Sequence, residues 1–104
     1  MMLSVLSRAG VTVRLTDERW AHIAEEHCEL AGMREEVLAA LSDADRVLAG
    51  SAGELLALRK MDDGKTLVVA YREVKTDDGF VITAFLTRRT GSLERRRQVW
   101  PEPS

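Results

Sequence analysis

The stretch that decides the fold is residues 54–87, which read ELLALRKMDDGKTLVVAYREVKTDDGFVITAFLT. Its runs of apolar and β-branched residues are 54–60, 66–74 and 80–87. Two Asp-Gly pairs, Asp63-Gly64 and Asp78-Gly79, separate these runs. Asp-Gly between such runs is typical of a tight β-hairpin turn, and connections this short allow only antiparallel neighbours. We therefore predict an antiparallel meander with its two turns at these pairs.

Shorter β-like segments flank this meander. Arg46–Ala49 precedes it, and the turn-prone residues 50–53 lie between the two. Gln98–Trp100 follows it as a predicted edge strand, which Pro101 ends. We therefore expect one antiparallel sheet of four or more strands over residues 45–100.

The first half of the chain has a helical pattern. A short alternating run at 11–15 leads into Thr16, whose hydroxyl suits a helix N-cap, and the carboxylates that follow suit the positive end of the helix dipole. Residues 33–42 predict a second helix, because their apolar side chains recur at helical spacing. Helices over about 16–42, followed by the sheet, predict a single α+β domain of residues 1–104 in which the N-terminal helices cover one sheet face.

Composition limits the class of protein. With 104 residues, of which 45% are apolar, the chain can bury the core of one domain without disulfides, and its single cysteine has no partner for one. No apolar run approaches the roughly 18 residues of a membrane span, and residues 1–9 lack the apolar core of a signal peptide. The expected location is therefore the cytoplasm, with no membrane partner.

The charges are unevenly distributed. The formal net charge of −2 argues against a protein that coats nucleic acid in general. Residues 1–52 hold five Arg against nine Asp or Glu, whereas residues 53–104 hold ten Lys or Arg against eight Asp or Glu. Five arginines near the C-terminus are Arg88, Arg89, Arg95, Arg96 and Arg97. This cluster predicts either a local surface that attracts phosphate or a solvated run of charge.

Both histidines lie in the first predicted helix. At 100° per residue His27 falls on the side of Trp20 and Ile23, whereas His22 points away from them. Two imidazoles that titrate near neutral pH suit acid–base catalysis. Their i, i+5 spacing is wrong for two zinc ligands on one helical face, so no metal or other cofactor is expected. The alternatives are a partly buried His27 hydrogen-bonded to a carbonyl and a solvated His22.

Two segments resemble a known nuclease group. Residues 19–29 read RWAHIAEEHCE and residues 81–85 read VITAF. They are similar to motifs of the phage-associated branch of the barnase, EndoU, colicin and RelE-like nuclease superfamily, which reads approximately Arg-Trp-x-His-Ile-x-x-x-His-Pro-Glu near the N-terminus and Ile-Thr-Ala-Tyr in a late strand. The resemblance spans roughly residues 12–100. It departs at Cys28, where the family has proline, and at Phe85, where the family has tyrosine.

This resemblance implies a RelE/barnase-like fold of N-terminal helices on a four-stranded antiparallel sheet. It also implies metal-independent cleavage of RNA by a toxin-like or phage-derived nuclease, often with a cognate antitoxin protein as partner. The residues carried over from the motifs are Arg19, Trp20, His22, Ile23, His27, Glu29 and Thr83. These families include inactive binding forms, so the alternative is a non-catalytic protein- or RNA-binding module on the same fold.

Cleavage through the 2′-hydroxyl of RNA needs a base, an acid and cations that hold the phosphate. The expected catalytic residues are His27, His22, Arg59, Tyr71 and Thr83, and the expected RNA-binding residues are Arg19, Lys60, Arg72, Thr87 and Arg88. Either histidine would be acid or base, guanidinium groups would clamp phosphate with paired donors, and Tyr71 would supply a hydroxyl or a stacking ring if it faces the site. Strand propensity alone is the alternative explanation for Thr83. Strict alternation predicts that Thr83, Phe85 and Thr87 share a face with Val81.

Overall fold

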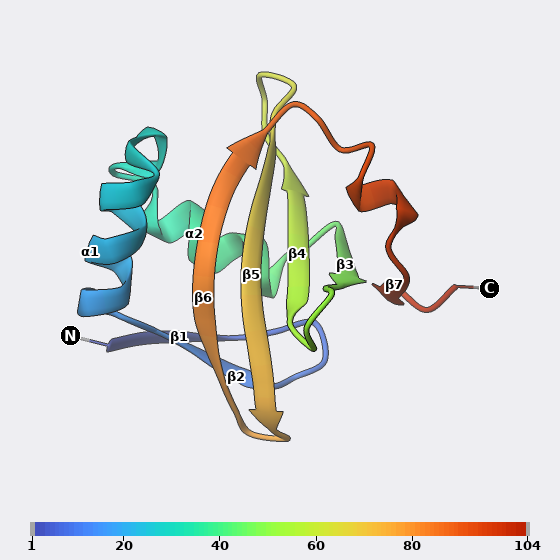
Figure 1. The fold of residues 1–104 in the computed structure, drawn as a ribbon. Coiled ribbons are helices and arrows are strands. Elements are labelled where there is room, and N and C mark those ends of the chain that lie inside the picture. Colours follow the sequence, from blue (N-terminus) through green and yellow to red (C-terminus); the bar gives the residue numbers. More distant parts are fainter. Residues whose placement is uncertain (1, 104) are drawn as a thin grey trace.

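The computed structural model describes residues 2–103 and contains one sheet with two α-helices and two short 3₁₀ helices (Figure 1). The strands are β1 (Met2–Leu6), β2 (Thr12–Thr16), β3 (Arg46–Ala49), β4 (Leu55–Lys60), β5 (Thr66–Lys75), β6 (Asp78–Thr87) and β7 (Gln98–Trp100). The helices are α1 (Asp17–Glu26), η1 (Cys28–Leu30), α2 (Arg34–Ser42) and η2 (Leu93–Arg95). The predicted α+β class is confirmed, and β7 is the predicted edge strand.

The sheet has seven strands in the order β1-β2-β6-β5-β4-β3-β7. β4, β5 and β6 form the predicted antiparallel meander, and no helix lies within residues 66–86. The expected order of helices followed by an entirely antiparallel sheet is wrong. A β1–β2 hairpin precedes the helices, and β2 joins β6 in parallel through the pairs Val13–Gly79 and Arg14–Phe80. This pairing is non-local, because both helices and three strands lie between β2 and β6 in the chain, so short turns do not predict it.

The two meander turns differ. At the first, Gly64 has φ +82°, a left-handed conformation that favours glycine, as the Asp63-Gly64 pair predicts. The second turn does not lie at Asp78-Gly79, because both residues belong to β6 and the turn falls at residues 76–77. Gly79 is required for space: a Cβ added there would lie 2.5 Å from the carbonyl oxygen of Arg72.

Both helices pack on one face of the sheet, which we call the inner face (Figure 1). Thr16 caps α1 as predicted, since its Oγ1 accepts a 3.0 Å hydrogen bond from the Arg19 amide. Ile23 of α1 and Val37 of α2 are buried in the core on this face with strand residues such as Val69. Among residues 2–103, neither helix has the length and apolar character needed to cross a membrane.

The opposite or outer face carries a second, smaller apolar cluster. Its buried members are Leu48, Leu56, Leu58, Val68, Ala70 and Leu93. An irregularity in β6 shifts the register, because Tyr71 pairs with Val81 while Ala70 pairs with Thr83. Thr83, Phe85 and Thr87 therefore share the outer face as predicted, but the expected placement of Val81 with them is wrong: Val81 is buried in the inner core. Strict alternation cannot anticipate an inserted residue.

Candidate active site

α1 lies along the edge of β6. Among residues 2–103, β2 pairs with β6 only at Gly79 and Phe80, and no other strand of this range pairs with this edge of β6. Helix α1 contacts β6 there, and Arg19 Nη1 donates a 3.3 Å hydrogen bond to the Ile82 carbonyl. An unpaired strand edge exposes backbone acceptors, and this contact occupies one of them. Helix α1 is therefore placed beside β6. It carries His22 and ends at Glu26, so the expectation that both histidines lie in this helix is wrong for His27, which is its C-cap.

His27 ends α1 at the rim of the outer face. Its backbone N–H donates the last hydrogen bond of the helix, to the Ile23 carbonyl at 2.8 Å, and its non-helical φ of −127° and ψ of 73° end the helix. Its imidazole lies against the ring of Phe85, with centroids 6.3 Å apart and planes inclined by 36°. The His27 side chain is 32% exposed, and its Nδ1 is 3.7 Å from the Glu29 carboxylate. An imidazole that solvent can reach thus stands next to the outer surface of β6.

His22 has different surroundings, as the helical phase predicts. Its Nε2 is 2.7 Å from the Glu26 carboxylate, one turn along the helix, and its side chain is 54% exposed. It lines an open pocket of about 640 Å³ together with Arg19 and other residues of α1 and its N-cap. His22 therefore lies on the exposed side of the helix, in the same open pocket as Arg19.

Besides Arg19, three more expected RNA-binding residues make internal contacts. Arg72 lies on the outer face, where its Nη2 donates a 2.9 Å hydrogen bond to the Ala52 carbonyl in the β3–β4 loop. The Thr87 hydroxyl bonds both the amide and the carbonyl of Arg89, at 3.0 and 3.1 Å. The Arg88 Nη1 donates to the Asp63 carbonyl at 2.8 Å. Thr87 thus has a local turn role, whereas each guanidinium keeps further donors for a ligand.

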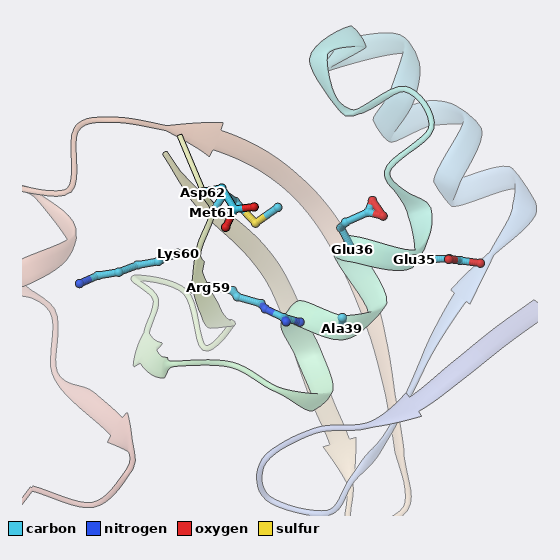
Figure 2. Close-up of a pocket in the computed structure, with 7 residues that line it drawn as sticks. All are labelled: Glu35, Glu36, Ala39, Arg59, Lys60, Met61 and Asp62. Atoms are coloured by element: carbon cyan, nitrogen blue, oxygen red, sulfur yellow. The ribbon is translucent and has the colours of Figure 1, made fainter. Parts of the chain in front are cut away.

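Two expected catalytic residues lie on the inner side of the sheet. Tyr71 is only 2% exposed, and burial raises the pKa of its phenol well above its ordinary value. Arg59 pairs with buried Leu67 and lines a pocket of about 340 Å³ beside Glu36 of α2. Figure 2 shows Arg59 directed toward α2 and Lys60 directed the opposite way, as predicted for adjacent strand residues. The structure therefore does not bring Tyr71 or Arg59 together with His27 and Thr83.

Phe85 is the contact that sequence reasoning missed, although its position two residues after Thr83 already placed both on one face. Lys65, Thr66 and Thr90 were also missed, and they line a pocket with Lys60 and Arg88. No pattern in the sequence points to this pocket, because it combines residues 60–66 of the β4–β5 hairpin with Arg88 and Thr90, which meet the hairpin only in the folded sheet.

The arrangement of these residues is the evidence for an activity, because a fold alone does not determine a function. Within residues 2–103, no three His, Cys, Asp or Glu side chains are grouped so that they could hold a metal ion. Comparison with models of known protein families, with characterised proteins and with solved structures finds no match for this chain.

Proposed function

We propose that the protein is a metal-independent endoribonuclease, RelE/barnase-like and either toxin-like or phage-derived, that cleaves RNA through its 2′-hydroxyl. The observation that carries this proposal is the contact of His27 with Phe85. It puts a solvent-accessible imidazole at the outer face of β6, on the same strand surface as Thr83.

Three groups lie along one short segment of β6. Arg19 reaches Ile82, Thr83 is the next residue, and His27 contacts Phe85. Residues 82–85 span roughly 10 Å of strand at about 3.3 Å per residue, which suits one or two nucleotides. Arg19 uses one donor on the Ile82 carbonyl, so its remaining N–H groups can hold a phosphate oxygen.

The arrangement of Arg19, Thr83 and His27 along β6 suggests a role for each in the cleavage. The 2′-oxygen bonds to phosphorus as the bond from phosphorus to the 5′-oxygen breaks. His27 takes the proton of the 2′-hydroxyl or protonates the departing 5′-oxygen, and a water molecule makes the other proton transfer. Arg19 and the Thr83 hydroxyl stabilise the charge that develops on the phosphorane. The partly exposed ring of Phe85 offers a surface on which a base can stack. As a toxin-like enzyme, it would be held inactive by a cognate antitoxin that covers this rim.

The test compares His27→Ala with His22→Ala. We expect His27→Ala to lower the single-turnover cleavage rate of a mixed RNA pool by roughly 10²- to 10⁴-fold, the contribution of a positioned acid or base. His22→Ala should lose less, because the half-exposed His22 pairs with Glu26, whereas His27 contacts Phe85 of β6. Both variants should keep the wild-type melting temperature.

The outcomes distinguish an endoribonuclease from a non-catalytic binding module on the same fold. Wild-type cleavage by a stably folded His27→Ala protein would overturn the catalytic role and favour a non-catalytic binding module. A large fall in its melting temperature would instead identify His27 as a core residue. The conservative variant His27→Gln then serves as a second test, since it preserves much of the side-chain volume without the ability to transfer a proton at neutral pH.

A further inference from the structure

A second basic site lies at the turn between β4 and β5. It is a pocket of about 340 Å³ lined by Lys60, Met61, Gly64, Lys65, Thr66, Arg88 and Thr90. We propose that this turn pocket binds a backbone phosphate of single-stranded RNA, near the position at which His27 acts. The identity of the ligand as RNA rests on the function proposed above, whereas the affinity for phosphate rests on the pocket itself.

The fold brings three cations to the turn pocket from separate segments. Lys60 ends β4 and pairs with Thr66 at the start of β5, which in turn pairs with Thr87 at the end of β6. Lys60 is directed away from Arg59 and α2 (Figure 2). Lys65 belongs to the turn, and Arg88 follows β6 and reaches across to the Asp63 carbonyl.

These cations are only partly neutralised. The Asp63 carboxylate is 3.7 Å from Lys65 Nζ. Burial opposes ionisation of Asp63, but the hydrogen bond from the Lys65 amide and the charges of Lys65 and Arg88 together lower its pKa. In the described part of the chain, Lys60 forms no ion pair. Two more carboxylates lie beside Lys60. Its amide donates to Asp45. Arg46 above all, with the charge of Lys60 as well, lowers the pKa of Glu94, and Glu94 is already paired with Arg46. The lining of the turn pocket itself holds three cations and no carboxylate.

The pocket also offers hydroxyl donors and open space. Thr66 is 8% exposed, and among residues 2–103 its hydroxyl makes no hydrogen bond although it is not sealed from solvent. Thr90 supplies a second hydroxyl. Gly64 has φ +82° at this turn, and its position lies beside the Arg88 guanidinium. Cations combined with hydroxyl groups are the usual partners of phosphate oxygens.

The C-terminal end of α1 and the turn between β4 and β5 lie toward the same end of β6 (Figure 1). Phe85, which contacts His27, precedes Thr87 by two residues, or roughly 7 Å of strand. Lys60 lies two strands across from Thr87, roughly 10 Å further. An RNA strand with its reacting phosphate at His27 would therefore bring a phosphate roughly two or three nucleotides away to Lys60. Such a contact positions the strand without reading its sequence.

The test uses a fluorescent RNA of about ten nucleotides, fully 2′-O-methylated so that cleavage through the 2′-hydroxyl cannot occur, with anisotropy recorded over a series of salt concentrations. Lys60→Ala should weaken binding roughly two- to fivefold, as expected for one partly exposed ion pair. It should also make the dependence of log K on log salt shallower by about 0.7. Lys75→Ala is the matched control, because it removes the same charge at the exposed far end of β5. It should leave both quantities nearly unchanged.

Equal effects of Lys60→Ala and Lys75→Ala would overturn the proposal, since only general charge would then matter. Titration with inorganic phosphate, followed through the amide signals of Lys65 and Thr66, tests the source of the phosphate. Saturation by inorganic phosphate with no competition from the RNA would overturn the RNA assignment. Binding that depends on Lys60 without any cleavage of ordinary RNA would refute the nuclease function alone. Cleavage that depends on His27, with binding indifferent to Lys60, would refute the turn pocket alone.

Discussion

Gly79→Ala should destabilise the protein far more than an average surface substitution. The new Cβ would lie 2.5 Å from the Arg72 carbonyl oxygen, about 0.9 Å short of an ordinary contact at 3.4 Å. The obstacle is backbone within the β5–β6 pairing, so no side chain can rotate away to relieve it. Gly79 also pairs with Val13, one of only two pairs that join β2 to β6. The β1–β2 hairpin should therefore loosen first.

The magnitude follows from overpacking, which costs about 1–3 kcal/mol where the surroundings must shift. In a domain of this size each kcal/mol lowers the melting temperature by roughly 4–8 °C, so we expect a fall of about 5–20 °C. Gly91→Ala is the control, because its Cβ would meet nothing within 4 Å and its φ is not left-handed. That variant should have the melting temperature of the wild type, or a free energy of unfolding up to about 1 kcal/mol higher.

Thermal unfolding followed by circular dichroism measures both variants, and hydrogen exchange of the β2 amides tests whether the hairpin detaches locally. Equal melting of Gly79→Ala and Gly91→Ala would refute the account of Gly79. A normal global stability with faster exchange in β2 would confine the strain to the junction of β2 with β6.

Two further outcomes are expected. RNA cleavage should continue in EDTA and weaken as salt rises, because counterions compete with Arg and Lys for phosphate; activity lost in EDTA and restored by magnesium or zinc would contradict the mechanism. Arg46 donates two hydrogen bonds to the Glu94 carboxylate, at 2.9 and 2.6 Å. These hydrogen bonds are the main reason that the pKa of Glu94 lies below its ordinary 4.5. The pair should therefore stabilise the fold above pH 4.5 and lose its effect as pH falls through the lowered folded-state pKa. Wild type should then melt above Glu94→Gln at neutral pH, with the two converging in acid, and a difference that does not change with pH would argue against this role.

Much of the local structure follows from sequence because its causes are local. Thr16 caps α1 through an amide three residues away, and the Gly64 turn needs a left-handed residue at one position. Apolar spacing on α1 likewise separates His27 from His22. Each of these features depends on a few neighbouring residues, so a pattern in the chain is enough to predict it.

The candidate site was predicted only in part. Alternation separated Arg59 from Lys60 and grouped Thr83 with Phe85, as the structure shows. It left open which face the helices would cover, and that choice buries Tyr71 and removes Arg59 from the outer face. The alternation of side chains between the two faces of a strand is a local property. Which of these faces the helices cover depends on how whole elements pack.

The sequence by itself determined the helices, the meander strands, the glycine turn and the opposite directions of the two histidines. Only the tertiary structure decided that β2 joins β6 in parallel, that the register of β6 shifts near Ile82, and that His27 meets Phe85. It also decided that Lys60 and Arg88 share a pocket. The physical reason is distance along the chain: the first group arises from hydrogen bonds and sterics among near neighbours, whereas the second depends on contacts between segments that come together only when the whole sheet has formed.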